Sequence, residues 1–208
     1  MGDYVFTSMQ DVQRNSQVFM QSMSNFEDEC IAYLQGKWNK RWSKGITPKA
    51  DNEFGRTSIL PELFMDHLGA QMATWRQKFQ TTGHMTIIYG AGGGHTLPED
   101  IAVGWVGLAL PNKNQHLSEI RWQIGDRKYG RVNLEAVHQY SEPIIIFEEG
   151  FFIDEEEALD IYGYIEPELP DNGPGGEADT LFQRIIMLGM AYYKQIDRVL
   201  GNTGAAIT

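Results

Sequence analysis

The chain has 208 residues, of which 42% are hydrophobic and 12% aromatic, and its formal net charge is −11. This length suits one main domain with a sizeable core, and the apolar content excludes a globally disordered chain. The single cysteine, Cys30, excludes an intrachain disulfide framework and a cysteine-rich zinc site. The first residues lack the pattern of a secretory signal, and no apolar run approaches the roughly 18 residues of a membrane span. The sequence therefore predicts a soluble protein with no membrane span.

The first 35 residues predict a long helix. Its apolar residues recur at alternating steps of four and three, with only Ser16 breaking the series, which is the spacing of a heptad-like seam. Such a seam packs either on the body of the same chain or between copies of the chain, and both interpretations stay open. The candidate oligomer-interface residues are Val5, Met9, Val12, Phe19, Met23, Phe26, Cys30 and Tyr33.

Residues 36–59 predict a basic hinge, because GKWNKRWSKGITPK contains five basic residues and no acidic ones. Basic residues interleaved with tryptophans can contact nucleic acid, lipid headgroups or an acidic protein face. The alternative is a solvated hinge whose tryptophans lie against the body of the protein. The candidate contact residues are Lys37, Trp38, Lys40, Arg41, Trp42 and Lys44.

Residues 60–82 predict a second helix. Ser58 can cap its start, Pro61 is tolerated in a first turn, and Gly83 can end it. Its apolar residues at helical spacing are Leu60, Phe64, Leu68, Met72, Trp75 and Phe79.

Residues 83–208 predict an antiparallel β-sandwich. Ile120, Trp122 and Ile124 alternate with polar residues, and the turn after them at Gly125 indicates a hairpin that resumes at Val132. Further strands are predicted at 85–89, 101–110, 144–147, 158–166 and 181–193, and no helical segment separates them. The expected fold class is α+β, with N-terminal helices followed by a jelly-roll-like antiparallel sandwich.

The excess negative charge lies at the C-terminal end of the chain. Residues 1–129 hold thirteen acidic and thirteen basic side chains, whereas residues 130–208 hold fifteen acidic and four basic ones. Such a surface repels phosphate backbones and argues against nucleic acid as a partner of that part.

The acidic stretch FEEGFFIDEEEALD at 147–160 has three interpretations. It lacks the glycine and the graded oxygen ligands of an EF-hand, and adjacent carboxylates in an extended turn point apart. A charged rim that limits edge pairing of the sheet is favoured, and cation binding or a glycosidase-like carboxylate pair are the alternatives.

No motif predicts catalysis, and no cofactor or metal is expected. A serine nucleophile elbow is absent, and the five histidines show no paired metal spacing. A cupin-like triad of His84, His95 and His116 remains a third hypothesis, for a metal enzyme.

The order of parts, together with segments such as SEPIIIFEEGFFIDEEEALDIYGYIE and QRIIMLGMAYYK, resembles virion structural proteins built on a jelly roll over residues 84–200. The resemblance implies a homo-oligomeric subunit of a capsid, decoration, turret or tail, which contacts other structural proteins. It also implies assembly in the host cytoplasm into a virion, with a cytoplasmic protein as the alternative. A second hypothesis is a sandwich that binds glycan or another ligand through Tyr129, Tyr162 and Tyr164.

Overall fold

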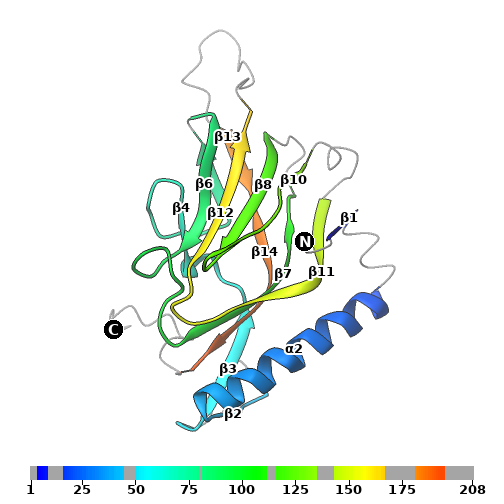
Figure 1. Cartoon of the computed structure of the whole chain (residues 1–208), viewed down its shortest axis with the longest axis vertical. Helices are drawn as coiled ribbons and strands as arrows, with labels where there is room; N and C mark the ends of the chain where they lie inside the picture. The colour runs from blue at the N-terminus through cyan, green and yellow to red at the C-terminus, as the bar shows by residue number, and fades with distance from the viewer. Residues whose placement is uncertain are drawn as a thin grey trace, which may run out of the picture.

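The computed structural model describes residues 4–8, 16–44, 50–79, 81–111, 116–134, 143–166 and 181–194. Two largely antiparallel sheets face each other, and one long helix packs against the first of them (Figure 1). In spatial order, the first sheet consists of β1 (Tyr4–Ser8), β11 (Pro143–Ile153), β7 (Ile101–Ala109), β14 (Ile186–Tyr193), β3 (Glu53–Ser58) and β2 (Arg41–Trp42).

The second sheet lies opposite the first. In spatial order it consists of β10 (Val132–Asn133), β8 (Leu117–Ile124), β12 (Leu159–Ile165), β6 (Gly83–Gly90) and β4 (Phe64–Asp66), and β9 (Arg127–Lys128) also pairs with β8. A separate small sheet joins β5 (Arg76–Phe79) to β13 (Leu181–Arg184). The prediction of a β-rich, sandwich-like fold is therefore confirmed.

Strand alternation explains the strands that the sequence predicted. In β12, every second residue from Leu159 to Ile165 is buried, whereas Asp160, Tyr162 and Tyr164 between them are partly exposed. The hairpin is also present, because β8 pairs with β9 across the turn at Gly125, whose φ of 54° suits glycine.

The helix α2 (Ser16–Trp38) is shorter than the predicted one. Residues 4–8 form β1, which pairs with β11, so the prediction of a helix from the first residues is wrong there. Met9 and Val12 of the predicted seam lie outside the described residues. The helix ends before Asn39, whose φ of 51° is a left-handed conformation that breaks the helical backbone.

The second predicted helix, over 60–82, is not formed. These residues contain a short 3-10 turn, η1 (Pro61–Leu63), followed by β4 and β5. Asp66 starts a turn, because its Oδ1 atom accepts hydrogen bonds from the backbone N–H groups of Leu68 and Ala70, at 2.9 Å each. Gly69 completes this turn with a φ of 81°, a conformation that a helix does not contain. The first sheet already includes β1, and β2 and β3 lie in the residues predicted as a hinge, so the sandwich does not begin at residue 83.

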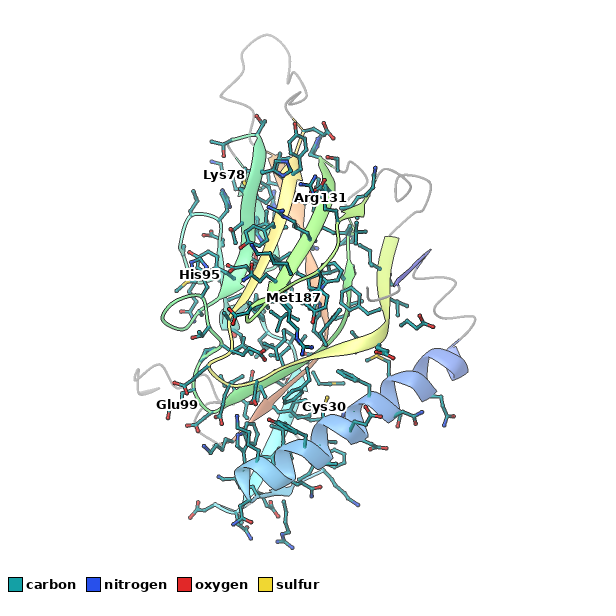
Figure 2. The ribbon with its side chains drawn as sticks, in the orientation of Figure 1. Cys30, Lys78, His95, Glu99, Arg131 and Met187 are labelled. Atoms are coloured by element: carbon teal, nitrogen blue, oxygen red, sulfur yellow. The ribbon has the colours of Figure 1, made fainter. Side chains whose placement is uncertain are left out.

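Two hydrophobic clusters hold the layers together. The larger one fills the space between the sheets and includes Trp105, Ile161 and Met187, which lies near the centre of the molecule in Figure 2. The smaller one joins α2 to the first sheet through Cys30, Leu34 and Trp38 on the helix and Phe54, Ala102 and Tyr192 on the strands. All nine residues of β7 are buried, because β7 contributes to both clusters.

Candidate functional site

The acidic turn at Asp154–Glu157 binds the C-terminal end of α2. Lys37 Nζ lies 2.7 Å from Asp154 Oδ1 and 3.1 Å from Glu155 Oε1. The Tyr33 hydroxyl donates to Asp154 Oδ2 at 3.0 Å, and Trp38 Nε1 donates to Glu155 Oε1 at 3.1 Å. We call this turn, with its bonds to the helix, the acidic clamp.

The acidic clamp also reaches the end of β14. Glu155 Oε2 accepts a hydrogen bond from the backbone N–H of Asp100 at 3.1 Å and lies 3.9 Å from Lys194 Nζ. Lys194 Nζ in turn lies 3.0 Å from Asp100 Oδ1. These bonds occupy the carboxylates with internal partners, so part of the acidic stretch fixes the helix to the sheet.

The pKa values of the clamp reflect these contacts. Burial by itself lowers the pKa of Lys37, but the hydrogen bonds to Asp154 and Glu155 outweigh it and the pKa is raised. The hydrogen bond to Asp154 is the main cause that raises the pKa of Tyr33. The charged ammonium of Lys37 and the neutral phenol of Tyr33 are therefore the forms that the clamp stabilises.

The rest of the acidic stretch borders a groove. Between α2 and β11 lies a groove of about 410 Å³, whose walls include Glu29, Glu148 and Glu149. Met23 and Phe26 provide apolar surface in the same groove. Among the described residues, no group of three or more His, Cys, Asp or Glu side chains is arranged to hold a metal ion.

The basic residues after the helix are distributed over several contacts. Lys37 and Trp38 belong to the acidic clamp, and Lys40 Nζ donates to the backbone carbonyl of Lys194 at 2.7 Å. Arg41 is exposed, and its Nη2 atom lies 3.8 Å from Glu53 Oε1. Trp42 packs against the small cluster under the guanidinium of Arg56, and Lys44 is exposed. Both tryptophans thus lie against the body of the chain; their contact with another molecule stays a prediction.

Three of the seam residues, Phe26, Cys30 and Tyr33, have contacts within the chain. Cys30 is buried in the small cluster, and Phe26 lies so close to Gly150 that a Cβ there would be 2.5 Å from its ring. Tyr33 is half-exposed and contacts the ring of Phe152. Their role in an oligomer interface stays a prediction, although the buried members are already covered by the first sheet.

Cys30 provides a chemical probe of this packing. Burial raises the pKa of its thiol from 9.0 to about 12, and its exposed fraction is 3%. Since only the thiolate reacts with disulfide reagents, we expect native protein at pH 8 to label with Ellman's reagent at least about a thousandfold more slowly than unfolded protein. Labelling at comparable rates would show that α2 does not cover the thiol.

The same thiol makes the stability of the protein depend on pH. Because the folded state favours the neutral thiol, Cys30 contributes to the free energy of unfolding below pH 9.0, and this contribution is lost as the pH rises toward 12.

The outer face of the second sheet gathers aromatic and charged side chains. Tyr162 on β12 is paired across the ladder with Arg121 on β8, whose guanidinium lies 5.0 Å from the tyrosine ring centre. The pKa of Tyr162 is raised, mainly by burial and further by the charge of Asp160 and a hydrogen bond to Asp160. The positive charge of Arg121 opposes this rise. Tyr164 lies further along β12 against His84, with ring centres 4.7 Å apart.

A pocket opens on this sheet at the β8–β9 hairpin. Its volume is about 150 Å³, and its walls are Arg121, Trp122, Gln123, Lys128, Tyr129 and Tyr162. Two of the three tyrosines predicted as ligand contacts, Tyr129 and Tyr162, therefore share one pocket. Tyr164 does not line it. The sequence did not indicate Arg121, Gln123 and Lys128 as site residues. Strand alternation places Arg121 and Gln123 on the outward face of β8, and this was the signal that could have identified these two.

The three histidines of the predicted cupin-like triad have separate surroundings. His84 packs on Tyr164. His95, labelled in Figure 2, has its Nδ1 atom 2.7 Å from Asp160 Oδ1 and its ring centre 4.1 Å from that of Tyr89. His116 precedes β8, where its backbone N–H bonds to Gln183. The structure does not bring them together as a metal site.

Comparisons with protein-family models, with curated proteins and with solved structures give no match. Over the described ranges, no helix is long and apolar enough to cross a membrane.

Proposed function

We propose that the sandwich is a jelly roll and that the chain is a structural subunit that assembles with copies of itself, most simply as a component of a virion. The supporting observation is the pairing order of eight strands. Taken along the chain, these are β3, β6, β7, β8, β10, β11, β12 and β14. The first pairs with the last, β6 with β12, β7 with β11, and β8 with β10, all antiparallel.

This nested pairing is that of a long antiparallel ribbon rolled around itself, which is the jelly-roll arrangement. It divides the strands into the sheets β3-β14-β7-β11 and β6-β12-β8-β10. Viral capsid proteins, lectins and cupins use this arrangement. A cupin holds its metal within the barrel, whereas the space between these sheets is filled by apolar side chains such as Trp105, Ile120 and Ile161. The proposal of a virion component therefore rests on architecture together with a packed interior.

The proposal predicts that the particles in solution have a larger mass than one chain. We expect multi-angle light scattering to show oligomers whose mass rises with concentration, and electron microscopy to show rings, fibres or shells. A compact monomer at every concentration that also turns over a small compound would contradict the proposal.

Leu68 is the first residue to test as a contact between copies. It is 70% exposed, the highest value among the large apolar side chains that the structure describes, and the Asp66 turn holds it in place. We expect Leu68→Asp to reduce the oligomer mass, because burial of a leucine is lost and a charge is introduced. Ala70→Ser, in the same turn, is the matched control and should leave the mass unchanged. Unchanged mass in Leu68→Asp would exclude this turn from the interface.

A further inference from the structure

The pocket at the β8–β9 hairpin contains a buried hydrogen-bond donor that lacks an acceptor. Arg121 Nε is buried and has no hydrogen-bond partner among the described residues, and Arg121 lines the pocket. The ring of Trp122 instead lies on the opposite face of β8, in the core between the sheets. A buried donor without an acceptor is destabilising, so its presence at a pocket indicates a place that an acceptor from a ligand can fill.

The pocket is also locally positive on an otherwise acidic protein. Within the described ranges no carboxylate lies within ion-pair distance of Arg121 or Lys128, and the guanidinium of Arg121 lies over the ring of Tyr162. The neighbouring Arg131 differs, because it pairs with Glu119 at 3.4 Å. Asp160, the nearest acidic neighbour of Tyr162 on its strand, is engaged by His95 at 2.7 Å. Arg121 and Lys128 thus present two unpaired cations to whatever occupies the pocket.

The walls define the shape of the occupant. Tyr162 contributes flat aromatic surface, whereas the ring of Tyr129 stacks on the buried Trp122 with an interplanar angle of 22° and faces the core. Gln123 adds an amide, although its Nε2 atom already donates to the carbonyl of Gly125 at 2.9 Å, so its carbonyl oxygen is the group left to accept. A volume of about 150 Å³ admits one small ring rather than an extended ligand.

We propose that this pocket binds a single acidic sugar residue, with the carboxylate on Arg121 and Lys128 and the ring against Tyr162. The planar guanidinium matches the geometry of a carboxylate, the aromatic ring of Tyr162 matches the C–H face of a pyranose, and Gln123 accepts from a sugar hydroxyl. Polyanions fit less well, because the net charge of −11 repels a phosphate backbone that extends beyond the pocket. All contacts come from one chain, so the site does not depend on the proposed assembly.

A matched pair of ligands tests the proposal without any substitution. D-glucuronate and D-glucose differ only in the carboxylate, and the Nε–H of Arg121 can be followed by NMR in the full chain. We expect glucuronate to shift this signal saturably, with a dissociation constant on the order of 1 mM, as suits a small open pocket. Glucose should bind at least about tenfold more weakly, because it leaves both cations unpaired.

Matched variants locate the site. Arg121→Gln should weaken glucuronate binding by about tenfold or more, and Arg121→Lys should weaken it less, because it keeps the charge but loses the planar fork. Arg127→Gln removes the same charge from an exposed neighbour outside the pocket and should have little effect. An equal loss in Arg121→Gln and Arg127→Gln would overturn the proposal.

Competing ligands separate the remaining interpretations. Acetate or inorganic phosphate that binds as tightly as glucuronate would show a simple anion site and overturn the assignment of a sugar. Uridine monophosphate that binds more tightly would assign the pocket to a nucleotide instead. Equal binding of glucose and glucuronate would exclude the role of Arg121 as a carboxylate ligand, and it would do so even if the Arg121 variants failed to fold.

Discussion

Gly107→Ala is expected to lower the free energy of unfolding by about 3 kcal/mol or to prevent folding. Gly107 lies in β7 between Ile146 of β11 and Leu188 of β14, and a Cβ atom there would collide with the backbone carbonyl oxygen of Ile145. A side chain could rotate away from such a contact, but a carbonyl in a ladder cannot. The strands must separate or lose hydrogen bonds, so the substitution acts on the centre of the first sheet.

Gly36→Ala is the matched control with the opposite expected sign. Gly36 lies in α2, and a Cβ atom there would have no neighbour within 4 Å. Alanine reduces the entropy of the unfolded chain, so we expect the free energy of unfolding to rise by roughly 0.5–1 kcal/mol. Urea denaturation followed by circular dichroism measures both variants. A Gly107→Ala protein as stable as the parent would show that β7 and β11 are not packed as described.

The same region explains why the first sheet bends. The pairing of β11 with β7 shifts between Ile146 and Phe151, and the pairing of β14 with β7 shifts between Leu188 and Gly189. Both shifts occur opposite Val106, and extra residues in one strand bend and twist a sheet locally. Gly150 lies in the shifted part of β11, where it leaves room for the ring of Phe26. The bend therefore creates the place where α2 docks.

The strands of the sandwich were predictable because their signals are local. The alternation of Ile120, Trp122 and Ile124 with polar residues requires only one buried face, and the structure buries these three. The helix over 60–82 was not predictable in this way. Phe64, Met72 and Phe79 are buried as the helical spacing requires, but Leu68 in the same series is exposed, because the Asp66 turn reverses the chain. The spacing matched a helix by coincidence, and the turn chemistry at Asp66 and Gly69 was the competing signal.

Partners distant in sequence account for the other differences. Residues 4–8 contain Tyr4, Val5 and Phe6, which suit a strand as well as a helical seam, and only pairing with β11 decides between them. The acidic turn likewise finds its cations on α2, more than a hundred residues earlier, where Lys37 and Asp154 are separated by 117 positions. The sequence predicted a charged rim that limits edge pairing of the sheet, but it could not indicate that cations of the same chain bind these carboxylates.

The candidate pocket was likewise predictable only in part from the sequence. Outward positions for Arg121 and Tyr162 follow from strand alternation in each segment. Their contact depends on the pairing of β8 with β12, which lie next to each other only in the rolled arrangement of the second sheet.

Glu155→Gln is expected to loosen α2 from the sheet. The glutamine keeps the size of the side chain but removes the charge that faces Lys37 and Lys194, and its amide cannot accept at both oxygen positions. Glu155 is mostly buried, whereas the side chain of Lys37 is 32% exposed, so solvent screening reduces the loss. We expect the free energy of unfolding to fall by about 2 kcal/mol.

The thiol of Cys30 reports this loosening directly, because it lies between α2 and the first sheet. A change of about 1.4 kcal/mol in the undocking equilibrium alters the labelling rate tenfold, so Glu155→Gln should label more than about tenfold faster than the parent at pH 8. Glu156→Gln is the matched control, since Glu156 is exposed next to Glu155 in the same turn, and it should change stability by less than about 0.5 kcal/mol. If both variants labelled at the same increased rate, the negative charge of the whole turn, rather than the bonds of Glu155, would hold the helix. Faster labelling of Glu155→Gln alone would assign the attachment of α2 to the acidic clamp.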